Sequence, residues 1–134
     1  FPALLMVEEK HATSYFHIPD EATLHAVALS ILTARLTSGD WYSNPEENEP
    51  PDPIDYDALK IPELPATLRG IAEDNLAEHE KIVREYKHDC EQFAAIMKAV
   101  QEKDGAAAWT LIQARDGYEY EAVKLVADTR KYHT

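Results

Sequence analysis

The chain has 134 residues, and its 25 Asp and Glu against 13 Lys and Arg give a formal net charge of −12 at pH 7. A nucleic-acid-binding protein usually carries a basic stripe, and this sequence has none, so we expect no nucleic acid among its partners. The length suits one domain, residues 1–134, with a real core. The only cysteine, Cys90, cannot form an internal disulfide, which favours a reducing, cytoplasmic compartment.

The N-terminal part is expected to form two short strands, Ala3–Glu9 and Thr13–Ile18. Side chains of the second strand alternate between two faces, with Ser14, Phe16 and Ile18 on one and Thr13, Tyr15 and His17 on the other. The first seven residues are apolar, but they are too few for a membrane span and lack the basic leader of a signal peptide. We therefore expect no contact with a membrane.

A helix is expected to follow from Asp20 to Ser38, with Asp20 as its N-cap and Gly39 as its terminator. Between Leu24 and Leu36 this helix is apolar almost all round, which is typical of a helix buried on every side. The sequence therefore predicts a central helix.

The next segment, at about 43–57, is expected to be an acidic, proline-rich loop. Four prolines lie between Asn44 and Pro53, and Gly39–Leu59 contains no Lys or Arg but seven acids: Asp40, Glu46, Glu47, Glu49, Asp52, Asp55 and Asp57. Prolines and like charges neither propagate a helix nor bury apolar surface. We expect a semi-extended arm that is dispensable for folding, with at most one helical turn within Ile54–Ile61.

Residues 66–103 are expected to form one uninterrupted amphipathic helix, because apolar residues recur along them with heptad spacing. At 1.5 Å per residue this helix would be about 50–57 Å long, whereas a compact chain of this length is roughly 36 Å across. We therefore expect it to project or to pair with another helix. The helix seam is predicted to consist of Leu76, His79, Val83, Tyr86, Cys90, Phe93, Met97 and Val100.

A stop is predicted at Lys103-Asp104-Gly105, followed by a short helix over Ala106–Arg115. The pattern of Tyr118–Val126 is interpreted as a strand, although a helix over 118–132 also fits it. The predicted fold class is α+β, a small antiparallel sheet of two N-terminal strands and one C-terminal strand. The sheet would pack on the apolar helix and on one long amphipathic helix, and its open edges would invite self-association.

No cofactor, metal or catalytic site is indicated. No phosphate-binding loop or dinucleotide fingerprint fits the four widely spaced glycines, Gly39, Gly70, Gly105 and Gly117. Glu85 and His88 have the Glu-x-x-His spacing of di-iron proteins, but they lie beside the apolar stripe and not within it. Glu8 and His11 repeat the spacing in a strand, where such residues face opposite sides.

His79 is the polar member of the stripe and is interpreted as a partly buried residue with one hydrogen-bonded nitrogen. The alternative is a register or pH device in the helix seam, with His25 as its partner. Cys90 is interpreted as a buried structural thiol, because His79 lies three helical turns away and His88 faces another side.

Four aromatic residues near the acidic arm and the last strand either cap the core or form a partner surface: Trp41, Tyr42, Tyr118 and Tyr120. Aromatics flanked by acids suit a basic protein partner. They are not placed for stacking on nucleic-acid bases, because no cations accompany them.

Two stretches, Ala108–Val123 and the Asp40-Trp41-Tyr42 element after the apolar helix, resemble short hypothetical proteins of actinobacterial viruses. The resemblance covers about a quarter of the chain. It implies a phage accessory protein without enzymatic activity, and no functional residue is carried over from it.

The leading hypothesis is a non-enzymatic protein–protein interaction module that is homodimeric through its long helix. One alternative is an acidic inhibitor that binds a basic surface of a host protein, favoured if the acids gather with the aromatics on one face. Another is a small enzyme or metal-binding protein, favoured by a closed pocket around His25, His79 or Cys90.

Overall fold

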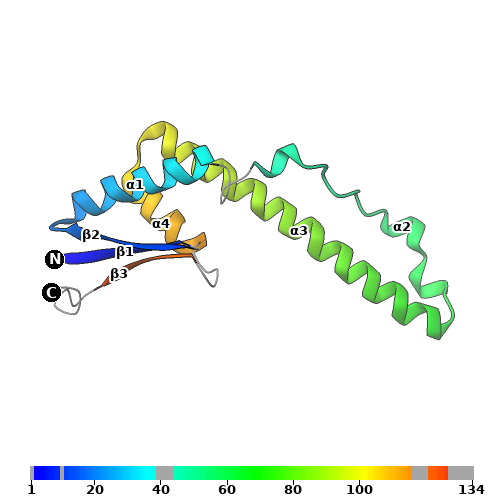
Figure 1. Cartoon of the computed structure of the whole chain (residues 1–134). Coiled ribbons are helices and arrows are strands. Elements are labelled where there is room, and N and C mark those ends of the chain that lie inside the picture. Colours follow the sequence, from blue (N-terminus) through cyan, green and yellow to red (C-terminus); the bar gives the residue numbers. More distant parts are fainter. Residues whose placement is uncertain (1, 10, 39–43, 116–120, 127–134) are drawn as a thin grey trace. The chain divides into compact units, whose positions relative to one another are not determined.

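The computed structural model describes residues 2–9, 11–38, 44–115 and 121–126. Within these ranges three strands form one antiparallel sheet, accompanied by four α-helices (Figure 1). This confirms the predicted α+β class. In chain order the elements are β1 (Ala3–Glu9), β2 (Ala12–Ile18), α1 (Glu21–Ser38), η1 (Pro45–Glu47), α2 (Tyr56–Leu59), η2 (Ile61–Glu63), α3 (Ala66–Glu102), α4 (Gly105–Arg115) and β3 (Ala122–Val126).

The sheet has the order β2-β1-β3, so the N-terminal strand lies in the middle. β1 pairs with β2 from Ala3↔Ile18 to Glu9↔Ala12, and it pairs with β3 from Leu4↔Val126 to Glu8↔Ala122. The predicted strands are confirmed, and residues 122–126 are strand and not helix. Residues 118–120, where the last strand was expected to begin, lie outside the described residues.

One face of the sheet forms a core with the helices. β1 contributes Leu5 and Val7, and their neighbours β2 and β3 contribute Ile18 and Val123. The helices add Leu24, Ala28, Leu32, Ile96, Ala99, Ala108 and Ile112. α1 and α4 pack on each other, α1 also contacts β2, and α4 also contacts β3. Ile18 is fully buried, but Ser14 and Phe16 of the same predicted face are exposed, as are Tyr15 and His17. The two predicted faces of β2 therefore differ in burial at Ile18 alone.

α1 buries one side only. Asp20 caps it as predicted, since its Oδ1 accepts the Thr23 N–H at 2.7 Å. The buried positions recur at helical spacing and are Leu24, Ala28, Leu32 and Arg35. The opposite side is exposed and carries Ala22, Ala26, Ser30, Thr33, Ala34 and Thr37. The expectation of a helix buried all round is therefore wrong, because small side chains that read as apolar or neutral tolerate water.

The geometry of the junction between α3 and α4 explains why α3 ends at the predicted Lys103-Asp104-Gly105 and why position 105 is a glycine. Lys103 takes the left-handed conformation at φ 54°, and the Asp104 N–H bonds the Ala99 carbonyl at 2.9 Å, which closes a Schellman motif after Glu102. Asp104 then caps α4, because its Oδ1 accepts the Ala107 N–H at 3.0 Å. Gly105 is not the left-handed residue. It is required because a Cβ there would lie 2.6 Å from the carbonyl oxygen of His25 in α1.

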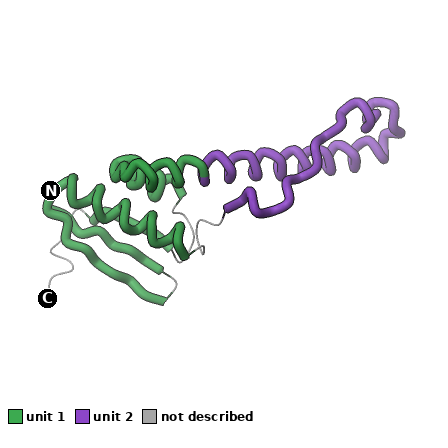
Figure 2. The backbone as a smooth tube through the Cα atoms, turned by 90° about the horizontal axis from the view of Figure 1, so that it is seen from above, with its two compact units in different colours: residues 1–43, 94–134 green, residues 44–93 purple. Residues whose placement is uncertain are grey.

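The chain divides into two compact units, residues 1–43 with 94–134, and residues 44–93 (Figure 2). The first unit holds the sheet, α1, α4 and the last residues of α3. The second holds the acidic segment, α2 and most of α3. This division into compact units does not test whether residues 1–134 fold as one domain, so the single domain stays a prediction.

Candidate interaction surface

The long helix begins where the sequence predicts. Pro65 precedes it, and the Pro65 carbonyl accepts the N–H groups of Leu68 and Arg69 at 3.0 and 2.9 Å. The Arg69 side chain reaches back, and its Nη2 donates to the Leu64 carbonyl at 3.0 Å. No glycine or proline interrupts the helix after Gly70, so α3 continues unbroken to Glu102.

In the second unit the acidic arm, which we define as residues 44–65, runs back along α3 (Figure 1). His79 Nε2 lies 2.9 Å from the Asp52 carbonyl oxygen, 27 residues away in sequence. A carbonyl can only accept, so His79 is the donor. The half-buried residues of the arm are Asn44, Pro45, Pro51, Ile54, Ile61 and Leu64. The expected semi-extended loop is thus an ordered strip that carries η1, α2 and η2, with the predicted single turn at Tyr56–Leu59.

Tyr86 and Cys90, one turn apart on α3, form a second polar contact in this unit. The side-chain hydrogen bond with Cys90 raises the pKa of the Tyr86 hydroxyl above its ordinary value, and partial burial and the negative charge of Glu46 act in the same direction. Glu46 belongs to the arm, so a negative charge of the arm acts on a hydroxyl of α3. Cys90 is half-buried and is the free thiol of the chain.

All eight predicted seam residues are half-buried. Six of them lie in the second unit, from Leu76 to Phe93, and two, Met97 and Val100, lie in the first. None is fully buried within the chain. The seam is therefore partly covered and partly open.

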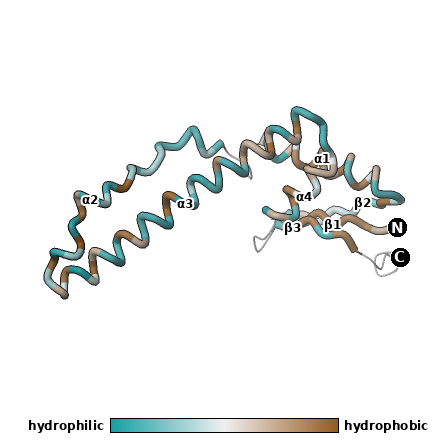
Figure 3. The backbone as a smooth tube through the Cα atoms, turned by 180° about the vertical axis from the view of Figure 1, so that it is seen from behind, coloured by the Kyte–Doolittle hydropathy of each residue, from teal (hydrophilic) through white to brown (hydrophobic). Residues whose placement is uncertain are grey.

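The open part of α3 carries large apolar side chains. Leu68, Ile71 and Ile82 are 53, 59 and 47% exposed. Leu68, Asn75 and Ile82 are seven residues apart and share one row, which borders the seam row of His79, Tyr86 and Phe93, and Ile71 lies on the other flank of this row. Hydrophobic residues recur along the whole of α3 (Figure 3). Near the start of the helix, Tyr56 and Leu59 of α2 are also exposed. The exposed row of Leu68, Ile71 and Ile82 is the surface that the seam prediction missed, although Ile82 widens the stripe in the sequence.

The last part of α3 buries a different side. Ile96 and Ala99 are 1 and 3% exposed and belong to the core, whereas Met97 of the seam row is only half-buried. At 100° per residue, Ile96 continues the row of Leu68 and Ile82 and lies about 40° from Val100 of the seam, whereas Ala99 lies on the side of that row away from the seam. The predicted seam therefore does not include the two core positions of this helix, although Ile96 widens the apolar stripe in the sequence.

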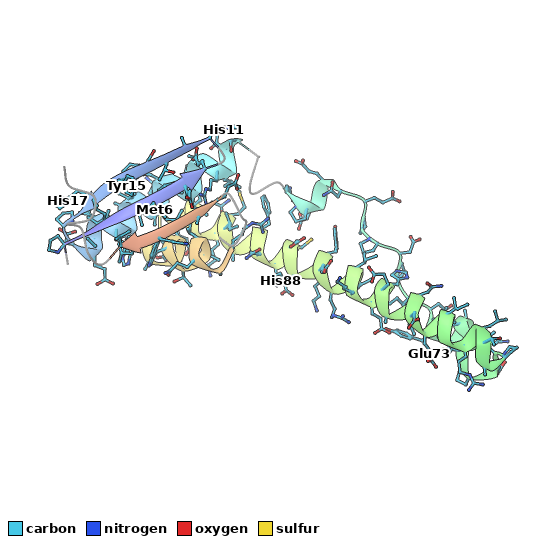
Figure 4. All side chains as sticks on the ribbon, turned by 60° about the horizontal axis from the view of Figure 1, so that its bottom comes forward. Met6, His11, Tyr15, His17, Glu73 and His88 are labelled. Carbon is cyan, nitrogen blue, oxygen red and sulfur yellow. The ribbon has the colours of Figure 1, made fainter. Side chains whose placement is uncertain are left out.

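The sheet leaves its second face uncovered by α1 and α4. Met6, Tyr15 and His17 lie on this face (Figure 4). β2 is an edge strand of the sheet, and Ile18 is the one buried residue of β2. Tyr15 and Phe16, on opposite faces of β2, are 47 and 41% exposed.

No metal-ligand cluster forms around the candidate residues in the part of the chain that the structure describes. Glu85 and His88 are exposed on α3. Within residues 2–9, 11–38, 44–115 and 121–126, no three His, Cys, Asp or Glu side chains gather as metal ligands would. His25 lies 3.7 Å from Glu21 one turn away, and His79 bonds the Asp52 carbonyl. None of the helices within the described ranges combines the length and the apolar character that a bilayer crossing requires.

The predicted aromatic surface of Trp41, Tyr42, Tyr118 and Tyr120 lies outside the described residues. Comparison with protein-family models, with curated proteins and with solved structures found no match to this chain. Its function must therefore be argued from its own surface.

Proposed function

We propose that the chain is a non-enzymatic protein–protein interaction module that forms a homodimer along α3. The observation that carries the proposal is the exposed row of Leu68, Ile71 and Ile82 beside the half-buried seam. Large apolar side chains that stay exposed beside polar ones are a usual mark of a protein contact. The acidic arm lies against α3 at His79, so the proposed contact uses the part of the helix surface that the arm leaves exposed.

The energetic argument follows from the size of these side chains. Full burial of a Leu or Ile stabilises by about 1.5–3 kcal/mol, so the exposed halves of three such residues leave a substantial gain for a partner. A single polar residue in such a row fixes register, and Asn75 lies midway between Leu68 and Ile82. This is the composition of a helix pair with a defined alignment.

A second copy of the chain is the partner that this surface favours. Two copies of one helix meet about a two-fold axis, so each exposed row covers the other and the contact closes. Residues on the other side of α3, such as Ala77, Lys81 and Arg84, are small or charged and exposed.

Light scattering coupled to gel filtration tests the proposal. Ile82→Glu should halve the mass of the assembly, because it places a carboxylate in the apolar row. Ala77→Glu is the matched control, since it adds the same charge at an exposed position on another side of α3, and it should leave the mass unchanged. A wild-type mass of 15.2 kDa at micromolar concentrations, or equal masses for wild type and Ile82→Glu, would overturn the α3 dimer.

A second candidate, an acidic inhibitor of a basic host protein, draws support from the arm itself. Its carboxylates at Glu46, Glu47, Glu49 and Asp52 are exposed while its backbone is held to α3 through His79. An ordered strip of acids suits a basic surface. Binding of a Lys- and Arg-rich peptide should be lost when Glu46, Glu47 and Glu49 are changed together to Gln. Retained binding would exclude the arm as the site. A role as a phage accessory protein stays a prediction.

A further inference from the structure

β2 forms an outer edge of the sheet, because the strand order is β2-β1-β3. It pairs with β1 over all seven of its residues, without a bulge, and six of the seven are exposed. One side of its backbone is therefore a straight run of hydrogen-bonding groups that β1 does not use. Such a run is a template for another strand.

Natural edge strands usually carry devices that block this pairing, such as an inward charge, a lysine, a proline or a bulge. The sequence of β2, Ala-Thr-Ser-Tyr-Phe-His-Ile, contains none of these. The other edge strand, β3, is shorter at five residues and carries Lys124. Within the described residues, no strand pairs with the outer side of β2, and none of these devices blocks it.

The charge distribution points to the occupant. Among the helices and strands that the structure describes, β2 is the one element without Asp, Glu, Lys or Arg. Two copies of a chain with net charge −12 repel each other, and this repulsion is least where neither copy presents a charge. A neutral edge on an acidic protein is therefore suited to a second copy of the same chain.

We propose that β2 pairs with β2 of a second copy, which joins the two sheets into one antiparallel sheet of six strands. This contact goes beyond the proposed α3 dimer and does not depend on it. A two-fold axis perpendicular to the sheet relates the copies, so each residue meets one on the same face. α1 and α4 of both copies then cover the same side of the joined sheet.

The strand length selects the register. All seven residues of β2 pair when Tyr15 lies opposite the second copy's Tyr15, which puts Thr13 opposite the second copy's His17. Aromatic residues directly opposite each other are favourable cross-strand pairs. Met6, which is paired with Tyr15 inside each sheet, continues this row on both sides.

Light scattering on four proteins tests the pairing against the α3 dimer. Tyr15→Lys puts like charges opposite each other at the centre of the contact, and Thr13→Lys is a second variant at an exposed position. Each should halve the wild-type mass. Gln113→Lys is the control, because it makes the same charge change at an exposed position on α4. Combining Tyr15→Lys with Ile82→Glu should leave a mass of 15.2 kDa.

Hydrogen exchange locates the contact. The amides of Ala12–Ile18 should exchange more slowly as the concentration of wild type rises, and those of Tyr15→Lys should not change. Thermal melts followed by circular dichroism check that each variant is folded. If both lysine variants keep the wild-type mass, or if Gln113→Lys lowers it equally, the β2 pairing is overturned. The α3 dimer is judged separately, by Ile82→Glu alone.

Discussion

At Gly105 two helices of the first unit lie against each other. The missing side chain of this glycine allows the start of α4 to lie against the backbone of α1 at His25, where a Cβ would be 2.7 Å from the Cβ of His25. Gly70, in contrast, has nothing within 4 Å of a Cβ built on it. The two glycines therefore have opposite roles, one forced by packing and one a weak point in an exposed helix.

Gly105→Ala should destabilise the protein by about 1–3 kcal/mol, because the backbone of α1 cannot move aside as a flexible side chain would. Gly70→Ala should stabilise it by about 0.5–1 kcal/mol, since alanine is the better helix former. Urea unfolding of both variants measures the two effects. Equal effects of one sign would contradict the close approach.

Asp20 provides a pH-dependent contribution. Its bond with the Thr23 N–H lowers the pKa of the Asp20 carboxyl below its ordinary value. A carboxyl with a lowered folded pKa contributes stability that is present above the unfolded pKa of about 3.9 and is lost as pH falls toward the folded value. Asp20→Asn keeps a capping oxygen without this titration.

The urea midpoint of wild type should therefore fall relative to that of Asp20→Asn as pH drops below about 4, and the difference should be constant above it. Other carboxyls titrate in both proteins and cancel in the comparison. A difference that stays constant through the acid range would mean that the cap does not depend on the charge of Asp20.

For α3, the sequence predicts the limits of the helix but not the side that it buries. Its limits follow from Pro65 and from the stop at Lys103, and both were predicted. The side that it buries changes along its length, from the half-buried seam at His79 to the core at Ile96. A heptad pattern reports which residues are apolar and regularly spaced, but it does not report which neighbours exist at each turn.

Ile96→Ala should cost about 2–5 kcal/mol, because Ile96 is fully buried in the core. Met97→Ala should cost clearly less, since Met97 is half-buried. Phe93→Ala should also cost less than the loss of a fully buried aromatic, because Phe93 is half-buried. Thermal denaturation ranks the three variants by their loss of stability. A larger loss for Met97→Ala than for Ile96→Ala would mean that the core contains the seam residues and not Ile96.

The acidic arm shows a second limit of the sequence. Its prolines and acids correctly predict little secondary structure, and α2 is the single turn that was expected within Ile54–Ile61. The bond from His79 to the Asp52 backbone was not predictable, because any residue supplies that carbonyl. His79 itself was recognised as a partly buried residue with one bonded nitrogen, and the structure agrees.

Ile61→Ser and Leu64→Ser should each destabilise the second unit by about 1 kcal/mol, because both side chains are half-buried. Glu47→Ser, at an exposed position of the same arm, should have little effect. Hydrogen exchange of the α3 amides reads the change locally. Equal protection in all three variants would show that the arm adds nothing to α3.

For the whole molecule, the net charge of −12 opposes every contact between copies. Salt screens this repulsion, and the Debye length is about 8 Å at physiological ionic strength. Self-association through α3 and β2 should therefore strengthen as salt is added, while binding of a basic peptide to the arm should weaken. Sedimentation at two salt concentrations distinguishes self-association from peptide binding, and self-association that weakens with salt would contradict both proposed contacts between copies.

The place of β1 in the sheet has a consequence for synthesis. A ribosome makes β1 and β2 first, but β1 pairs with β3 near the other end of the described chain, at Leu4↔Val126. Until that segment emerges, the nascent hairpin has two open edges, and its core face lacks Val123 and Ile112. A ribosome that stalls before Ala122 would thus release a chain in which the seven-residue β1 is an edge strand in place of the shorter, Lys124-bearing β3, and clearance of such fragments would fall to chaperones and proteases.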